Sequence, residues 1–209
     1  SGDFNVLTQF ANWGFDKYPA RRKALFIWGH GNGWYNAYNR FCPDNESGSA
    51  ISVPDGEFDL ALKNINFHLD ILVLDACNML AIEVISEVYQ YADYILGSET
   101  IICPDGFPYD EILSLWEDHT DPQALADQLA LTYANSYMPS GSQNPYFDPL
   151  EIAMATVKTS AFPELLNAIT DFVTVWQDNE PEIFLTAREN CLITFNDFEA
   201  EIDIKAVSY

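Results

Sequence analysis

The sequence predicts a single layered α/β domain with a mainly parallel central sheet. Short apolar runs typical of buried strands alternate along the chain with longer segments whose apolar residues have helical spacing. The chain has 209 residues, 48% of them hydrophobic, which is enough for one domain with a sizeable core. No segment resembles a linker, so we expect one domain over residues 1–209.

The first half of the chain supplies three expected strands. Residues 3–18 form a helix that ends at Pro19, and residues 23–28 (KALFIW) form a buried strand. Residues 35–58 are polar and rich in turn residues, and we expect them to be irregular. A second strand covers residues 69–74, a helix covers residues 80–91, and a short third strand covers residues 94–97.

The second half continues the alternation. After a loop with Pro104, Gly106 and Pro108, a helix covers residues 122–137, with proline at its favoured first position. The remaining expected elements are a strand over residues 150–156, a helix over 163–177, a short helix over 181–190 and a last strand over 192–195.

The charge of the chain limits the partners it can have. Acidic residues outnumber basic ones by 32 to 9, which gives a formal net charge of −23. This field repels nucleic acid and attracts cationic ligands or basic peptides. The plainer alternative is that the acids only keep a secreted protein soluble. No apolar run approaches the roughly 20 residues of a membrane-spanning helix, so no span is predicted.

The four cysteines do not indicate a metal site. They form no CxxC pair and no Cys/His zinc spacing. Cys42 and Cys103 each lie in a Cys-Pro-Asp segment, and a disulfide between them in an oxidising compartment stays open. Sequence alone does not fix the geometry that such a bond needs.

Two strand ends carry reactive side chains. The strand that ends at Trp28 leads to His30, and the strand that ends at Leu74 leads to Cys77. In open α/β sheets, ligands bind at the carboxyl ends of the strands. If the two strands are parallel neighbours, the thiol and the imidazole lie at one edge and can perform covalent acyl transfer.

The surroundings of these two residues suit that chemistry. Cys77 is expected where a helix starts, which would lower its pKa and offer backbone N–H groups to an oxyanion. Gly31 permits a close approach of the backbone, so its N–H could point at the same oxyanion. The alternative for Cys77 is a core cysteine, and His-Gly alone is a weak signal. His68 and His119 follow no strand end and compete poorly as the base.

Two segments resemble a known family. IWGHGNGW and LVLDACNM resemble the His-Gly and Asp-Ala-Cys segments of clostripain-like cysteine peptidases, and the spacing of 47 positions from His30 to Cys77 suits that family. FANWGFDKYPARRKALFIWGHGNGW and YILGSETIICPDGFPYDEIL extend the resemblance, which continues in weaker form to about Asp203. It implies a caspase-like fold, a three-layer α/β/α sandwich with a mainly parallel central sheet. It also implies a cysteine endopeptidase that cleaves after arginine or lysine through a thioester acyl-enzyme.

The resemblance also implies roles for single residues. Cys77 is the nucleophile, His30 is the general acid/base, and the N–H groups of Gly31 and Cys77 bind the oxyanion. Asp75 and Asp105 are the acids expected near the pocket for the residue before the scissile bond, where a carboxylate pairs with a guanidinium.

These acids have alternative roles. For Asp75 the alternative is a structural cap on the Cys77 loop, and for Asp105 it is ordinary turn chemistry in Pro-Asp-Gly. Glu99 is a further candidate for which a structural role is favoured.

The sequence also departs from the family pattern. Relatives begin with an additional strand-helix-strand unit, which this sequence lacks. Some relatives cut themselves between the histidine and the cysteine. Arg40 is the only basic residue within residues 35–58, so Arg40–Phe41 is a candidate self-cleavage bond.

The resemblance implies no required cofactor. Some clostripain-like enzymes respond to calcium, and residues 44–46 form an acidic loop, but without EF-hand spacing. The expected partners are proteins or peptides with basic residues. The expected protein is a bacterial monomer exported to the periplasm, the cell surface or the medium.

Two rival functions stay open. The same fold and dyad could cleave after acidic residues or asparagine, which Asp75 and Asp105 disfavour. The domain could instead be a catalytically inactive binding or scaffold module. Retention of both His30 and Cys77 counts against such a module, and the missing first unit counts for it.

Overall fold

The computed structural model describes residues 2–34, 41–118, 121–143 and 152–177. The chain divides into two compact units, residues 1–165 and residues 166–209. The strands of the described residues all lie in the first unit, and of the second unit only residues 166–177 are described. The extent of one domain over residues 1–209 stays a prediction.

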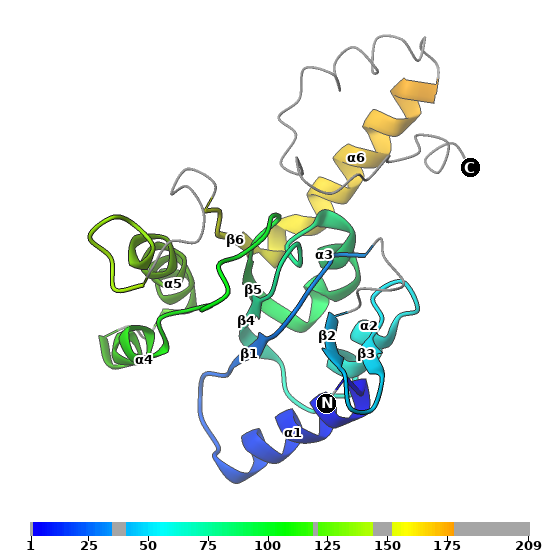
Figure 1. The fold of residues 1–209 in the computed structure, drawn as a ribbon. Coiled ribbons are helices and arrows are strands. Elements are labelled where there is room, and N and C mark those ends of the chain that lie inside the picture. Colours follow the sequence, from blue (N-terminus) through cyan, green and yellow to red (C-terminus); the bar gives the residue numbers. More distant parts are fainter. Residues whose placement is uncertain (1, 35–40, 119–120, 144–151, 178–209) are drawn as a thin grey trace. The chain divides into compact units, whose positions relative to one another are not determined.

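A four-stranded sheet forms the centre of the first unit (Figure 1). Its order is β1 (Ala24–Trp28), β4 (Leu69–Asp75), β5 (Ala92–Gly97) and β6 (Ala155–Lys158). The first three strands are parallel and β6 is antiparallel to β5. The predicted α/β fold with a mainly parallel sheet is therefore confirmed.

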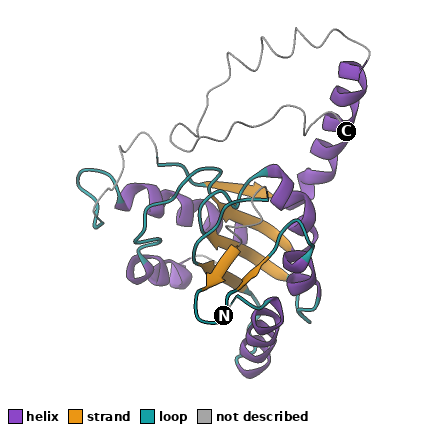
Figure 2. Ribbon diagram, turned by 45° about the vertical axis from the view of Figure 1, so that its right-hand side comes forward, coloured by secondary structure: helices purple, strands orange, loops and turns teal. Residues whose placement is uncertain are grey.

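Helices lie on both sides of this sheet (Figure 2). In chain order they are α1 (Phe4–Lys17), α2 (Glu57–Lys63), α3 (Ile82–Val88), α4 (Tyr109–Asp118) and α5 (Pro122–Ser136). A sixth helix, α6 (Phe162–Gln177), begins at the end of the first unit and belongs mostly to the second. Helix α1 packs on α2 and α2 packs on α3, whereas α4 packs on α5. In the described part of the chain, every helix is too short or too polar to cross a lipid bilayer.

The core under α5 positions the site. Ile71, Val73 and Leu96 on one face of the sheet are buried against Leu129 and Tyr133 of α5. Strand β4 is buried on both faces, as expected for a central parallel strand. The last residues of β4 are therefore held rigidly where the chain leaves the sheet.

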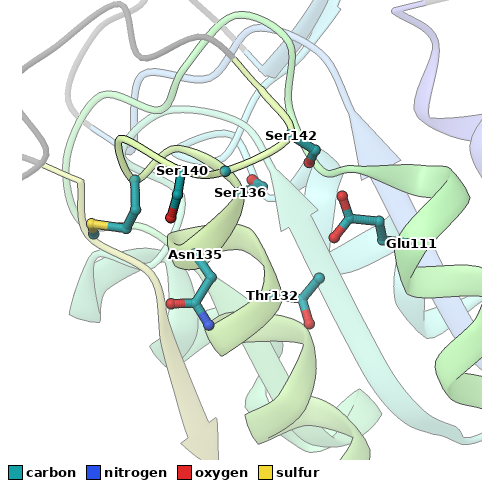
Figure 3. Close-up of a pocket in the computed structure, with 8 residues that line it drawn as sticks. Glu111, Thr132, Asn135, Ser136, Ser140 and Ser142 are labelled. Atoms are coloured by element: carbon teal, nitrogen blue, oxygen red, sulfur yellow. The ribbon is translucent and has the colours of Figure 1, made fainter.

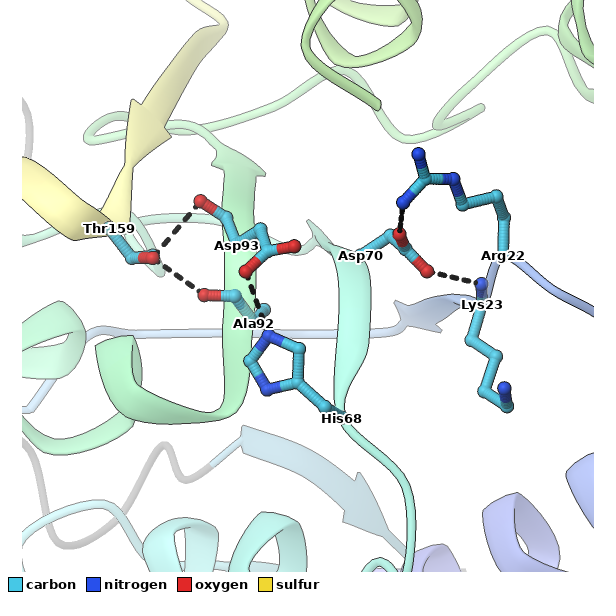
Figure 4. Close-up of polar contacts among 7 residues, drawn as sticks. All are labelled: Arg22, Lys23, His68, Asp70, Ala92, Asp93 and Thr159. Carbon is cyan, nitrogen blue, oxygen red and sulfur yellow. Dashed lines mark hydrogen bonds and ion pairs between the residues drawn. The ribbon is translucent and has the colours of Figure 1, made fainter. Parts of the chain in front are cut away.

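The register of β1 and β4 is fixed at their amino ends (Figure 4). The carboxylate of Asp70 accepts a hydrogen bond from the Arg22 guanidinium at 2.6 Å and another from the backbone N–H of Lys23 at 2.8 Å. Ala24 then pairs with Ile71, and Trp28 pairs with Asp75 at the opposite end. The polar anchors lie at one end of these strands, and the candidate site lies at the other.

The expectation of an irregular segment over residues 35–58 is wrong for its described part. Strands β2 (Phe41–Asp44) and β3 (Ser49–Ile51) form an antiparallel hairpin, and α2 follows. Phe41 and Ile51 are register partners and both are buried, so two apolar anchors outweigh the polar residues between them. Residues 35–40 lie outside the described residues.

Other elements differ at their boundaries. Helix α4 was not expected, and the strand expected over residues 150–156 occurs as β6, later in the chain. Ile152 and Met154 pack against the core without strand pairing, which explains the shift. Helix α3 is shorter than expected and is followed by a 3-10 turn over Tyr89–Tyr91. The elements expected over residues 181–190 and 192–195 lie outside the described residues.

Candidate active site

The His30 and Cys77 loops leave the sheet at the same edge. Strands β1 and β4 are parallel neighbours, and Trp28 pairs with Asp75 at their carboxyl ends. The ladder continues one step further, because the Gly29 N–H donates to the Asp75 carbonyl at 3.2 Å. The condition for bringing His30 and Cys77 to one sheet edge, that the two strands are parallel neighbours, is therefore met.

Gly31 brings the two loops into contact. A methyl group on its Cα would lie 2.6 Å from the carbonyl oxygen of Cys77 and 2.7 Å from Cγ of Met79. No side chain fits in that space, so only glycine allows the histidine loop to approach the cysteine this closely. The adjoining His30 side chain is exposed, as a group that meets a substrate must be.

The hairpin holds the histidine loop from a second side. The backbone N–H of Cys42 on β2 donates to the carbonyl of His30 at 2.8 Å. Cys42 has a left-handed backbone, with φ 51°, and its sulfur lies 3.9 Å from the carbonyl of Trp28. Cys42 is a free thiol, so the disulfide with Cys103 is not formed in the structure.

The loop after β5 holds the turn that carries Cys77. The N–H of Ile102 donates to Sγ of Cys77 at 3.4 Å. The N–H of Asn78 donates to the Thr100 carbonyl at 2.9 Å. Asn78 is buried and has φ 63°, a left-handed conformation that asparagine tolerates better than most residues. The half-buried thiol is therefore fixed by its own turn and by a facing backbone donor.

The expectation that a helix start lowers the pKa of Cys77 is wrong. Helix α3 begins only at Ile82, so the thiol does not sit in its first turn. Burial raises the pKa of Cys77, and the nearby charge of Asp75 raises it further, while the hydrogen bond from Ile102 opposes this. At neutral pH the thiol is protonated and needs a base to become a nucleophile.

Asp75 is fully buried at the end of β4. Its Oδ2 accepts hydrogen bonds from the N–H of Phe107 at 3.2 Å and from the hydroxyl of Tyr109 at 2.8 Å. No described residue hydrogen-bonds its Oδ1. Desolvation raises the pKa of Asp75, and the two hydrogen bonds only partly offset this. The carboxylate thus caps the loop over residues 106–109, and its other oxygen is buried without a donor among the described residues.

Asp105 lies exposed on the turn next to this carboxylate. The turn is closed by the Gly106 N–H, which donates to the Cys103 carbonyl at 3.0 Å. A methyl group on Gly106 would lie 2.6 Å from Oδ2 of Asp75, so the Asp105 turn packs directly on Asp75. Asp105 therefore lies in a turn, as the alternative for this residue expected, and the glycine that follows it packs on Asp75.

The remaining candidates have other surroundings. Glu99 is exposed, and its neighbours Ser98 and Thr100 make the structural contacts of that loop. His68 pairs with Asp93 at 2.8 Å, at the opposite end of the sheet from His30 (Figure 4). His119 and Arg40 lie outside the described residues.

The described residues give no metal site. No group of three or more His, Cys, Asp or Glu side chains among them is placed to hold a metal ion. In the acidic loop over residues 44–46, Asp44 accepts hydrogen bonds from the Ser47 hydroxyl at 2.7 Å and the Glu46 N–H at 3.0 Å. This carboxylate stabilises its own turn.

Trp28, Ile102 and Tyr109 contribute to the site without having been singled out from the sequence. Trp28 precedes His30 by two residues, as Asp75 precedes Cys77. If the two strands are parallel neighbours, residues at the same distance from the strand ends share one face of the sheet, so Trp28 could have been predicted to lie beside Asp75. Ile102 acts through its backbone, and Tyr109 acts across a loop, so no local pattern marks either residue.

A polar cavity of about 540 Å³ lies elsewhere, between α4 and the end of α5 (Figure 3). It is lined by Glu111, Thr132, Asn135, Ser136, Met138, Ser140, Gly141 and Ser142. Neither His30 nor Cys77 belongs to its lining, and it is a separate feature of the surface.

Comparison with known proteins gives consistent matches. The model of the clostripain family matches residues 1–207. No curated protein matches the chain. A secreted C11 cysteine protease from Bacteroides thetaiotaomicron, solved with an irreversible peptide inhibitor, is 26% identical with a TM-score of 0.68, over 81% of this chain and 49% of that one.

Two further solved structures are similar. An inactive zymogen C11 protease from Parabacteroides distasonis is 27% identical with a TM-score of 0.58, over 78% of this chain and 42% of that one. Another structure of a secreted C11 protease from Bacteroides thetaiotaomicron is 19% identical with a TM-score of 0.57, over 78% of this chain and 46% of that one, and supports the fold alone. The chain spans about half the length of the structures it matches.

Proposed function

We propose that this chain, which belongs to the clostripain family of cysteine peptidases, is an endopeptidase that cleaves after arginine or lysine with Cys77 and His30 as its dyad. The observation that carries the proposal is the contact of Gly31 with the backbone of Cys77, which joins the histidine and cysteine loops at one sheet edge. The family supplies the reaction type, and the dyad and the specificity are part of the proposal.

Because the pKa of Cys77 is raised, its thiol needs a base, and His30 is that base in the proposed mechanism. His30 removes the thiol proton as sulfur attacks the peptide carbonyl carbon, and a tetrahedral oxyanion forms. The C–N bond then breaks, His30 gives the proton to the departing amine, and a thioester joins the substrate to Cys77. Water, deprotonated by His30, attacks the thioester and releases the acid and the thiol.

The backbone N–H groups of Gly31 and Cys77 bind the oxyanion in this proposal. The close packing of Gly31 on the carbonyl of Cys77 supports it, because this contact brings the two backbone segments together at one sheet edge. Such donors are fixed before the reaction and need no reorganisation when charge develops on the carbonyl oxygen.

Asp75 and Asp105 form the acidic pocket for the basic side chain. The free Oδ1 of Asp75 supports this role, since a buried carboxylate oxygen without a donor is costly until a cation reaches it. Asp105, exposed on the turn that packs on Asp75, offers a second carboxylate nearer the solvent. An acidic substrate residue would be repelled from both.

Self-cleavage at Arg40–Phe41 is a further part of the proposal. Phe41, the residue after this bond, is buried and paired with Ile51, so the new end of a cut chain would stay anchored. The gel pattern of the purified protein is compared with that of Cys77→Ala. Two fragments in the wild type and one intact band in the variant are expected, and an intact band in both would refute self-cleavage.

The proposed enzyme needs no cofactor, because thiol catalysis requires none. Its substrates are proteins or peptides with basic residues, and we propose that it is an exported bacterial monomer. A solved relative is described as secreted, which supports export.

An arginyl and a lysyl reporter peptide test the function, with Cys77→Ala as control. Hydrolysis of either reporter by the wild type and its loss in the variant are expected. A basic chloromethyl ketone separates the enzyme from a binding module, because it labels Cys77 only if the thiol is reactive. A wild type that neither hydrolyses the reporters nor takes up the label would contradict the proposal.

A further inference from the structure

An exposed indole lies beside the acid of the proposed specificity pocket. Trp28 is the last residue of β1, and 63% of its surface is exposed. It is the register partner of Asp75, so the two side chains leave neighbouring strands on the same face of the sheet. Phe26, two residues earlier on that face, packs against the rings of Phe107 and Tyr109. Trp28 continues this row to the edge where the reaction takes place.

Gly106 fixes how close the indole and the acid come. A methyl group on its Cα would lie 2.6 Å from Oδ2 of Asp75 and 3.1 Å from Nε1 of Trp28. The carbonyl of Gly106 accepts hydrogen bonds from the Tyr137 hydroxyl at 2.6 Å and from Nε2 of Gln143 at 3.0 Å. The indole nitrogen of Trp28 and the carboxylate of Asp75 therefore both lie close to the same glycine, which two hydrogen bonds hold in place.

Asp75 has only one carboxylate oxygen without a hydrogen-bond donor among the described residues, whereas a guanidinium can donate to two acceptors at once. Its Oδ2 already accepts from Phe107 and Tyr109, and Oδ1 is the oxygen without a donor. A guanidinium presents a planar fork of donors, whereas an ammonium is a compact point charge. With one oxygen free, Asp75 holds either head by a single strong bond and by itself does not favour arginine over lysine.

We propose that Trp28 is a specificity-determining residue: its exposed indole is the wall on which the planar guanidinium of the substrate lies, and it makes the site prefer arginine to lysine. This rests on the proposed function of the site. A guanidinium stacks on an aromatic face while its edge donates to a carboxylate, and an ammonium gains less from the stack. The indole thus supplies the discrimination that the occupied Asp75 does not.

Trp28→Leu tests the inference, measured as the ratio of kcat/KM for an arginyl reporter to that for a lysyl reporter of the same sequence. The wild type is expected to prefer arginine, and the variant is expected to lose about fivefold or more of that ratio. Trp28→Phe keeps an aromatic face and should retain most of it. Trp13→Leu, an exposed tryptophan on α1, is the matched control and should leave the ratio unchanged.

The outcomes separate the inference from the function. A wild type that cleaves neither reporter contradicts the proposed function. A wild type that prefers lysine, or a leucine variant with the wild-type ratio, overturns the role of Trp28 alone. Equal ratios in the phenylalanine and leucine variants also overturn it. Far-UV circular dichroism and alkylation of Cys77 by iodoacetamide verify folding, and Trp28→Met provides the comparison if the leucine variant does not fold.

Discussion

Asp75 holds a loop in place, and in the proposed function it also binds the basic side chain of the substrate. One of its oxygens holds the loop over residues 106–109, and the other has no donor among the described residues. Burial raises the pKa of this carboxyl, because the charged form loses its hydration. An ionised Asp75 therefore lowers the stability of the folded chain, and in the proposed function the cation of the substrate offsets that cost.

Asp75→Asn should stabilise the protein at neutral pH and impair its activity. The pKa of Asp75 is higher in the folded chain than in the unfolded chain. The stability that this carboxyl contributes is therefore fully present below the unfolded pKa, and it is lost as the pH rises through the folded pKa. Asparagine does not ionise and escapes that loss. We expect a higher Tm at pH 7, no gain in acid, and kcat/KM for basic reporters lower by about 10- to 100-fold.

Asp70→Asn on the same strand is the control for this change. Asp70 pairs with Arg22 and with the N–H of Lys23, so its replacement should lower Tm. An Asp75→Asn protein that is less stable than the wild type at pH 7 would show that the carboxylate is mainly a structural cap.

Gly31 is the residue at which the two loops depend on each other most directly. Gly31→Ala places a methyl group 2.6 Å from the Cys77 carbonyl, which forces the loops apart. We expect a loss of about 1–3 kcal/mol in the free energy of unfolding. A misplaced dyad should also lower kcat/KM by roughly 100-fold. Chemical denaturation and reporter hydrolysis measure the two effects.

Gly14→Ala is the matched control for Gly31→Ala. Gly14 lies inside α1 with nothing near its Cα that a methyl group would meet. Alanine there should stabilise the protein by about 0.5–1 kcal/mol and leave activity unchanged. If Gly31→Ala were as harmless as Gly14→Ala, the contact between the loops would not matter for catalysis.

At the scale of elements, the strands that position the site could be predicted, and the loops that shape it could not. β1 and β4 are apolar runs that are recognisable in the sequence, and His30 and Cys77 were identified as candidates because they follow the ends of these strands. Helix α4 carries Ile112 and Leu115 at helical spacing, so this helix could have been predicted from the sequence. The hairpin depends on the pairing of Phe41 with Ile51 across a polar turn. This pairing follows from burial of both side chains in the folded core and leaves no local pattern in the sequence.

The loops around Asp75 and Cys77 show why loop geometry could not be predicted from the sequence. Five backbone and side-chain contacts define these loops, and all of the contacts join residues far apart in the chain: Phe107 and Tyr109 to Asp75, Ile102 to Cys77, and Tyr137 and Gln143 to Gly106. Such contacts follow from tertiary packing and leave no periodic pattern in the sequence.

Helix α5 should influence specificity through Tyr137, which follows its last residue. The Tyr137 hydroxyl donates to the carbonyl of Gly106, and Gln143 donates to the same oxygen, so the carbonyl keeps one donor in Tyr137→Phe. We expect a loss of about 0.5–1.5 kcal/mol in the free energy of unfolding. A looser Gly106 turn should raise KM for basic reporters, while iodoacetamide alkylates Cys77 at an unchanged rate.

Tyr94→Phe is the control, because the Tyr94 hydroxyl donates only to the exposed side chain of Gln123 at 3.3 Å. Tyr94→Phe should change neither KM nor stability appreciably. Equal KM values in the two phenylalanine variants would show that α5 does not act on the pocket.

At the scale of the whole molecule, the charge of −23 should assist the capture of basic substrates. An excess of carboxylates attracts cationic peptides over distances beyond direct contact, and salt screens this attraction. We expect kcat/KM for a peptide with several basic residues to fall severalfold as ionic strength rises, while alkylation by neutral iodoacetamide does not change. Salt-independent hydrolysis would indicate that the acids serve solubility alone.

The central claim is the dyad, and one comparison tests it most directly. The hydrolysis of an arginyl reporter is measured for the wild type, Cys77→Ala, His30→Ala and His68→Ala. His68 pairs with Asp93 at the opposite end of the sheet and serves as the matched control for His30. We predict no detectable hydrolysis by Cys77→Ala, a loss of about 10²- to 10⁴-fold in His30→Ala, and wild-type rates in His68→Ala. Wild-type hydrolysis by either Cys77→Ala or His30→Ala would contradict the account.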